Sequence, residues 1–231
     1  MKRRPEGWQR MRLVITIGTV LLAISLFQGM CTKPNKLNLT KEVEQYVLSK
    51  RGKNLVSLNL TGGDRRPNEQ PVTATVHKLQ YESGCKHVQK SDYPRCKDFY
   101  IWYIYESIVT PFTLPVNLTV LYKGEKNETL PSDLNDATHV YWNPENLTTP
   151  IVYTQEYYEE KCNFIVPITF KGWFTYEVQQ SVGDTPLKDA LGIGNVVESS
   201  KKLTASDSLT VLYNVSGVFQ HTVVCTSKKT T

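Results

Sequence analysis

The sequence predicts an all-β, disulfide-bonded protein. Three observations indicate this class: short apolar runs rich in Val, Ile, Tyr, Phe and Trp, turn residues between those runs, and a cysteine-containing body behind a secretory leader. With 231 residues, 40% hydrophobic and 21% charged, the chain has ordinary globular composition. The length fits one large β-sandwich or two tandem modules of about 100 residues each.

The first half contains one helix candidate and four strand candidates. The helix is expected at Thr40–Lys50, where Val43 and Val47 lie one turn apart and Thr40 can cap the first turn. Asp98–Thr110 carries apolar side chains at both parities, which favours a central strand covered on both faces. The strand candidates are runs of β-branched and aromatic residues between Gly- and Pro-rich loops: Leu55–Leu60, Val72–Leu79, Asp98–Thr110 and Val116–Tyr122.

The second half follows a polar stretch, Gly124–Pro150, which is rich in Asn, Asp, Glu and Pro and is expected to be a polar linker or long loop. Within Gly183–Ala205 a helical turn is expected at Pro186–Leu191. Strands are expected at Ile151–Tyr157, Asn163–Phe170, Trp173–Val182, Leu209–Asn214 and Val218–Thr226. The predicted organisation is a leader at 1–31, a first β module at 32–123, the linker at 124–150 and a second β module at 151–231.

The leader at residues 1–31 predicts a secretory signal peptide. Five basic residues and one acidic residue flank a 15-residue apolar run, Leu13–Phe27. Gly29 and Cys31 supply small residues for cleavage immediately after Cys31. The alternative is an uncleaved signal anchor, which would make the chain a single-pass type II membrane protein. Either way, residues 32–231 enter the secretory pathway.

The cysteine count agrees with cleavage, because removal of Cys31 leaves an even number. The four that remain are expected to form disulfides: Cys85, Cys96, Cys162 and Cys225. Four cysteines allow three pairings, and proximity along the chain favours Cys85–Cys96 and Cys162–Cys225. Free buried cysteines are the alternative.

Glycosylation sequons are the strongest signal in the chain. Of 13 asparagines, six begin an N-x-[ST] triplet, where about two would arise by chance. The leader delivers these to the glycosylating compartment, so glycan is expected at Asn38, Asn59, Asn117, Asn127, Asn146 and Asn214. Each modified asparagine must face solvent, which restricts both the fold and any binding face.

Three residues of the second half have a familiar spacing. Cys162 is followed 11 residues later by Trp173 and 63 residues later by Cys225. This resembles an immunoglobulin-like sandwich, in which a Trp packs on an inter-sheet disulfide. The resemblance covers residues 150–231 and implies an immunoglobulin-like second module; the alternative is an unrelated disulfide-bonded β fold.

Charge and motifs exclude several functions. The net charge is +5, but the leader holds +4 of it, so the body carries only +1 and has no strong positive field for nucleic acid. The H-E-x-x-H, G-x-S-x-G and P-loop motifs do not occur. We therefore predict no catalytic residue, no cofactor and no metal ligand, and we expect the chain not to be an enzyme.

Aromatic residues are the positive candidates for binding, since Tyr and Trp anchor many protein interfaces. Tyr153, Tyr157 and Tyr158 lie near the Asn146 sequon and are predicted to form a partner-binding patch; strand packing is the alternative. Because glycan cannot lie inside a tight interface, binding is expected in segments without sequons: Cys85–Asp98, Tyr153–Lys161 and Gly183–Ala205.

Together these signals predict a secreted or cell-surface glycoprotein that binds an extracellular or cell-surface protein. Its role would be that of a ligand, a decoy receptor, or a virus-type immune modulator or envelope-type glycoprotein. It would contact a membrane only through an uncleaved leader. One alternative is a type II membrane-anchored accessory subunit. The other is a secreted hydrolase with a scattered active site, which alanine substitutions would test at His77, His87, His139 and His221.

Overall fold

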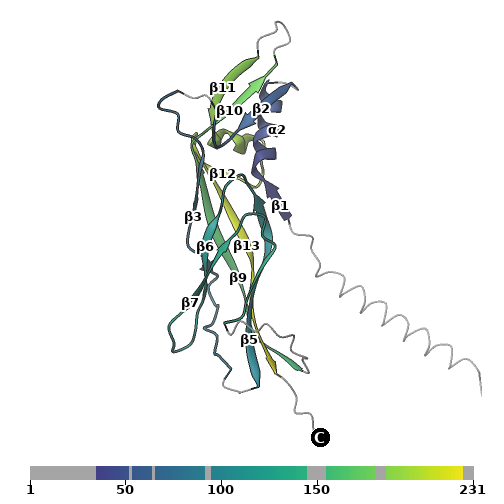
Figure 1. Cartoon of the computed structure of the whole chain (residues 1–231), viewed down its shortest axis with the longest axis vertical. Coiled ribbons are helices and arrows are strands. Elements are labelled where there is room, and N and C mark those ends of the chain that lie inside the picture. The colour runs from purple at the N-terminus through teal and green to yellow at the C-terminus, as the bar shows by residue number, and fades with distance from the viewer. Residues whose placement is uncertain are drawn as a thin grey trace, which may run out of the picture. The chain divides into compact units, whose positions relative to one another are not determined.

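Three long strands form the framework of the structure, a computed structural model (Figure 1). They are β5 (Cys96–Val109), β9 (Gln155–Lys171) and β13 (Thr210–Cys225). β13 lies between the other two and pairs antiparallel with both. At about 3.3 Å per residue, each strand spans roughly 45–55 Å. The protein is all-β and disulfide-bonded, as predicted.

The structure describes most of the chain after the leader: residues 35–51, 54–63, 66–91, 95–144, 155–179 and 186–225, without the side chains of 155–159. These residues belong to one compact unit, Pro34–Thr231. β5 comes from the segment expected as a first module and β13 from the segment expected as a second, yet the two pair along ten residues of β13. Strands from both segments therefore share one sheet.

Short strands extend this main sheet at both sides. β1 (Asn35–Asn38) runs parallel to β5, and β8 (His139–Trp142) pairs antiparallel with it. The others pair antiparallel with β9 or with the start of β13: β3 (Thr73–Val76), β4 (Gln80–Tyr81) and β12 (Thr204–Asp207).

A smaller antiparallel sheet lies at one end of the long strands, beside helix α2 (Leu39–Arg51) (Figure 1). Its order is β11 (Leu187–Gly192), β10 (Trp173–Val178) and β2 (Leu55–Asn59), and the 3-10 helix η2 (Ile193–Glu198) follows β11. Arg51 Nε donates to Tyr176 Oη at 2.9 Å, and Tyr176 Oη donates to Asp189 at 3.1 Å. These bonds join the end of α2 to the sheet.

Helix α2 occupies the predicted segment, but its cap is one the sequence analysis missed. Asn38 Oδ1 accepts a hydrogen bond from the Lys41 backbone N–H at 3.0 Å, so Asn38 and not Thr40 caps the helix. The buried side chains recur at helical spacing and face the core: Leu39, Val43, Tyr46 and Val47.

A two-stranded hairpin, β6 (Pro115–Val120) and β7 (Glu128–Asp133), packs against one face of the main sheet. Val116, Leu118 and Val120 alternate with solvent-facing residues and are buried in the common core. Tyr81 of β4, a strand of the main sheet, donates its hydroxyl to the Thr119 carbonyl of β6 at 2.7 Å. The face of the sheet covered by the hairpin is called the inner face below.

Several predicted elements differ in extent or type. The two strands expected between Ile151 and Phe170 are one strand, β9, and the two expected between Leu209 and Thr226 are one strand, β13. Gly and Pro do not interrupt these pairings, because Gly217 and Pro167 both occupy paired positions. The helical turn expected at Pro186–Leu191 was wrong, since β11 pairs there with β10. Gly124–Pro150 contains β7 and β8.

The two disulfides are Cys85–Cys162 and Cys96–Cys225. The pairing expected from proximity along the chain was therefore wrong. Cys96 and Cys225 lie directly opposite each other on β5 and β13, so strand register brings them together across 129 residues. Cys162 and Cys225 lie on the neighbouring strands β9 and β13 of one sheet and are not bonded to each other. The inter-sheet disulfide implied by the immunoglobulin resemblance is thus not formed.

The expected signal peptide, residues 1–31, lies outside the described residues. In the part of the chain that the structure does describe, no helix has both the length and the apolar character needed to cross a bilayer.

Candidate functional site

The central strand β5 presents different side chains on its two faces. Tyr100, Trp102 and Ile104 point to the inner face and are buried. Tyr103 is on the outer face and is 36% exposed, and Tyr105 is 41% exposed. The sequence predicted a strand covered on both sides. That prediction was wrong at Tyr103 and Tyr105, because alternation gives the parity of a side chain and not what covers it.

Tyr105 is the extra residue of a β-bulge. Ser216 of β13 pairs with Glu106 and the next residue, Gly217, pairs with Ile104, so Tyr105 has no partner on β13. A Cβ on Gly217 would lie 2.0 Å from the Tyr103 carbonyl oxygen, so only glycine fits beside the bulge. Two exposed tyrosines, Tyr103 and Tyr105, therefore lie at the bulge, on either side of the buried Ile104.

Strand β8 adds a third tyrosine to this face. Tyr141 pairs with Ile101 of β5, and His139 pairs with Tyr103. Tyr141 is 52% exposed, and its ring centroid lies 5.7 Å from that of Phe99. We call the surface formed by Tyr103, Tyr105 and Tyr141 the tyrosine face.

Polar residues border the tyrosine face across the sheet. On β13, the buried Val218 lies opposite Tyr103, and the half-buried Gln220, a polar residue, lies opposite Ile101. On β9, Asn163 and Lys161 continue these two rows and are exposed. An aromatic centre with a polar rim is the usual arrangement of a protein interface.

The tyrosines singled out from the sequence lie on or before β9. The backbone of Tyr157 pairs with Val223 and that of Tyr158 with Thr222, which itself pairs with Phe99. Tyr153 and the side chains of Tyr157 and Tyr158 lie outside the described residues. No signal in the sequence separates Tyr103 and Tyr105 from their buried neighbours, because β5 carries apolar or aromatic side chains at both parities.

Two other segments expected to bind a partner make contacts within the fold. In the described part of Cys85–Asp98, Val88 is buried and Lys90 donates to Glu128 of the hairpin at 2.8 Å. This hydrogen bond raises the pKa of the Lys90 ammonium. In the described part of Gly183–Ala205, Ile193 and Val196 are buried.

Five of the six sequon asparagines lie in described residues, and Asn146 does not. The side chains of Asn59, Asn117, Asn127 and Asn214 are exposed, and that of Asn38 is half-buried. Asn38, Asn59 and Asn127 use Oδ1 to accept backbone hydrogen bonds. Among the described residues, none of the five donates a hydrogen bond through Nδ2. Nδ2 is the atom that carries an N-linked glycan, so the fold leaves this atom open at all five.

The four histidines are placed very differently. His221 has no exposed surface, its Nε2 lies 2.8 Å from Asp98 Oδ1, and its ring stacks on Tyr100. His77, His87 and His139 are exposed. Across the described ranges, no group of three or more His, Cys, Asp or Glu side chains is arranged to hold a metal ion.

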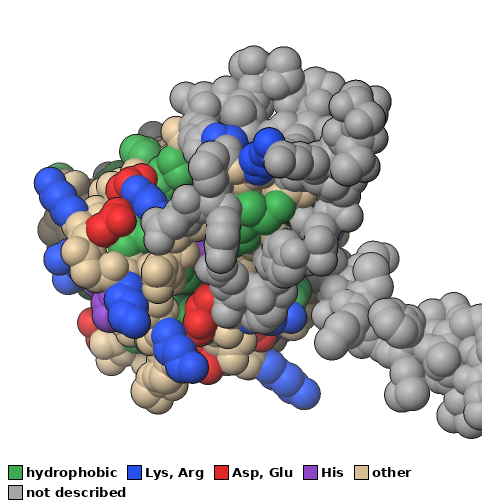
Figure 2. Space-filling model, turned by 90° about the horizontal axis from the view of Figure 1, so that it is seen from below, with side chains coloured by type: hydrophobic (Ala, Val, Ile, Leu, Met, Phe, Trp, Pro, Cys, Tyr) green, Lys and Arg blue, Asp and Glu red, His purple; other side chains and the backbone are tan. Residues whose placement is uncertain are grey.

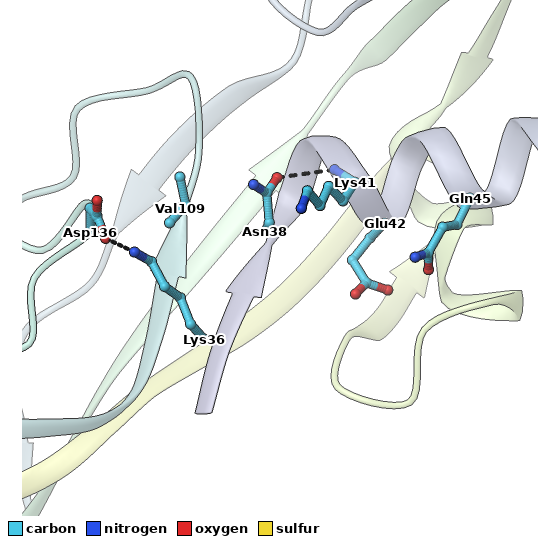
Figure 3. Close-up of a pocket in the computed structure, with 7 residues that line it drawn as sticks. All are labelled: Lys36, Asn38, Lys41, Glu42, Gln45, Val109 and Asp136. Carbon is cyan, nitrogen blue, oxygen red and sulfur yellow. Dashed lines mark hydrogen bonds and ion pairs between the residues drawn. The ribbon is translucent and has the colours of Figure 1, made fainter. Parts of the chain in front are cut away.

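A pocket of about 430 Å³ lies where β1 enters α2 (Figure 3). Lys36 forms an ion pair with Asp136 on one side, and Lys41, Glu42 and Gln45 of α2 lie on the other. Asn38 lies between these two groups. The end of β5 contributes Val109.

Charged side chains of both signs lie on the described part of one face of the molecule. Figure 2 shows Lys and Arg side chains interspersed with Asp and Glu over the described part of the face seen from below. This agrees with the near balance of charge outside the leader.

No protein-family model matches the chain, and no curated protein matches its sequence. Among solved structures, the Cry23Aa1 and Cry37Aa1 binary protein complex has a chain with 8% identity and a TM-score of 0.46, covering 81% of this chain and 85% of that chain. A non-toxic crystal protein from Bacillus thuringiensis has 10% identity and a TM-score of 0.38, with coverage of 82% and 93%. The β-pore-forming protein Mpp75Aa1.1 from Brevibacillus laterosporus has 8% identity and a TM-score of 0.29, with coverage of 77% and 70%. At these scores the similarities support no statement about function.

Proposed function

We propose that this chain is a secreted or cell-surface N-glycosylated protein that binds another extracellular protein through the tyrosine face. The observation that carries the proposal is the clustering of Tyr103, Tyr105 and Tyr141, all exposed, on adjacent strands of one sheet. The narrower roles of ligand, decoy receptor, immune modulator and envelope-type glycoprotein fall within this proposal.

Tyrosine suits this role because it brings a rigid apolar ring and a hydroxyl at low entropic cost. The β-bulge turns Tyr105 out of the regular pleat, and the contact with Phe99 restricts the ring of Tyr141. Side chains held in this way lose little freedom on binding, which favours affinity.

The glycan sites are compatible with such a face. Asn214 lies on the outer side of β13, four residues along the strand from Val218, which is opposite Tyr103. At about 3.3 Å per residue this is roughly 13 Å from the row of Tyr103 and roughly 7 Å from Ser216, the partner of Glu106 beside Tyr105, so a glycan at Asn214 borders the Tyr105 end of the tyrosine face. The two disulfides fit the oxidising compartment in which glycans are added.

The test is secretion and cell binding of the tagged full chain made in mammalian cells. We expect a secreted product that loses mass on enzymatic deglycosylation. We also expect that changing Tyr103, Tyr105 and Tyr141 together to Ser lowers binding to responsive cells by tenfold or more, because aromatic anchors dominate interface energies. The matched control changes Val56 and Leu187, exposed apolar residues of the smaller sheet, to Ser.

Two results would contradict the proposal. One is a cytosolic product with reduced thiols and a mass that deglycosylation leaves unchanged. The other is a correctly folded triple variant that binds as tightly as the control. N-terminal sequencing separates the two modes of display: a start at Thr32 indicates a secreted protein, and an intact leader indicates a type II anchor.

A further inference from the structure

We propose that the pocket between β1, α2 and β5 seats the first sugar of a glycan carried by Asn38, an N-acetylglucosamine linked to Nδ2. This inference rests on the proposed function, because it requires passage through the glycosylating compartment. The glycan at Asn38 would then pack against the protein, whereas glycans at the other sequons would extend from the surface.

The first argument is the placement of Asn38. Of the five described sequon asparagines it is the half-buried one, and it lines the pocket. Its Oδ1 is held by the Lys41 backbone N–H, which fixes the plane of the amide. Nδ2 donates no hydrogen bond among the described residues, so the attachment atom is oriented and unoccupied by protein.

The second argument is the chemistry of the lining. A pocket of about 430 Å³ falls within the range of about 300–1,000 Å³ of small-molecule sites. An acetylated amino sugar needs donors and acceptors for its hydroxyls and acetamide, together with some apolar contact. The pocket supplies polar groups from Lys36, Lys41, Glu42, Gln45 and Asp136, and Val109 supplies an apolar surface.

The attachment step is balanced without any redox partner. Nδ2 of Asn38 attacks C1 of the sugar on a lipid-linked diphospho-oligosaccharide donor. The C1–N bond forms as the C1–O bond breaks, the lipid diphosphate leaves with the electron pair of that bond, and the proton lost by Nδ2 passes to solvent. Oδ1 keeps its lone pairs, so the cap of α2 survives modification.

The test measures how fast peptide-N-glycosidase releases each glycan from the native secreted protein, by glycopeptide mass spectrometry. We expect release at Asn38 to be at least tenfold slower than at exposed Asn214, and the two rates to become equal after denaturation. Gln45→Ala should speed release at Asn38. Glu44→Ala, an exposed change on the same helix that leaves the pocket intact, should not.

A second measurement uses Asn38→Asp, which removes the glycan and keeps an oxygen that caps α2. We expect it to lower the melting temperature of the secreted protein by several degrees, and Asn214→Asp to leave it unchanged. Native release as fast as at Asn214, or an unmodified Asn38 beside occupied sites elsewhere, would overturn this inference alone. The absence of glycan from every sequon would overturn the proposed function as well.

Discussion

The Cys96–Cys225 disulfide gives the most quantitative prediction of the structure. It closes a loop of 129 residues and joins the paired ends of β5 and β13. We expect the double change Cys96→Ala and Cys225→Ala to lower the free energy of unfolding strongly while leaving the strand order unchanged.

The magnitude follows from the covalent path that remains when Cys85–Cys162 is intact. That path runs over the 11 residues from Cys85 to Cys96 and the 63 from Cys162 to Cys225, so it spans about 74 residues. Closing a loop of this length stabilises by about 4.5 kcal/mol in the chain-entropy account. For a unit of this size the melting temperature should fall by roughly 10–15 °C.

The assay is denaturant unfolding followed by tryptophan fluorescence, with calorimetry as the second probe. The m-value should rise with the loss of stability, because the unfolded chain is less constrained and exposes more surface. A fall of less than about 1 kcal/mol would refute the entropy argument.

Peptide mapping tests the pairing itself. Lys86, Lys90 and Arg95 lie between Cys85 and Cys96, so trypsin separates these two cysteines. Under non-reducing conditions we expect the Cys85 peptide linked to the Cys162 peptide. Recovery of a Cys85–Cys96 link would refute the strand register on which the whole calculation depends.

Three further predictions concern the core of the sheet. Gly217→Ala should cost about 1–3 kcal/mol of folding free energy in denaturant unfolding, because its Cβ would meet the Tyr103 carbonyl at 2.0 Å and Phe164 at 2.9 Å. His221→Ala should cost about 3–5 kcal/mol, since it empties a fully buried ring site and leaves the Asp98 carboxylate with the Ser91 backbone N–H, whereas His77→Ala at an exposed site should change stability by less than about 0.5 kcal/mol. Burial raises the pKa of Tyr213 to about 12, because the folded state favours the neutral phenol. The stability that this group contributes is therefore complete below pH 10 and is lost as the pH rises toward 12. Tyr213→Phe should therefore flatten the fall in stability between pH 10 and 12, while losing about 1 kcal/mol at neutral pH with the hydrogen bond to the Ser107 carbonyl.

The sequence predicted those strands and the helix that can be identified from residues close together in the chain. The density of β-branched and aromatic residues in β5 and β6, and the helical spacing of Val43 and Val47, depend on neighbours within a few residues. β7 escaped prediction because its sequence, ETLPSD, has little strand propensity and is ordered by pairing with β6. The pairing of the cysteines was not predicted either, because strand register across 77 and 129 residues decides which sulfur atoms meet.

The sequence predicted what kind of site to expect, a patch of exposed tyrosines, but it did not predict where that patch lies. Aromatic density in Asp98–Thr110 was visible in the sequence, and it was interpreted as burial. Whether Tyr103 is covered depends on what lies over the outer face, and that is decided by where the hairpin β6–β7 packs. Because the hairpin covers the inner face, Tyr100 and Trp102 became core and Tyr103 became surface. A single sequence carries no signal for that choice.

The Cys96–Cys225 disulfide, the β-bulge and two residues of the tyrosine face all lie on the same strand, β5. Cys96 fixes the end of β5 only seven residues before Tyr103, and Gly217 fixes the register just beyond it. Between these two points β5 is paired with β13 and, from Tyr100 to Tyr103, with β8 as well. A strand held in this way cannot slide, so Tyr103 keeps its orientation without a partner. Loss of the Cys96–Cys225 bridge should then weaken binding at temperatures where the sheet remains folded, because the face would have to be ordered during association.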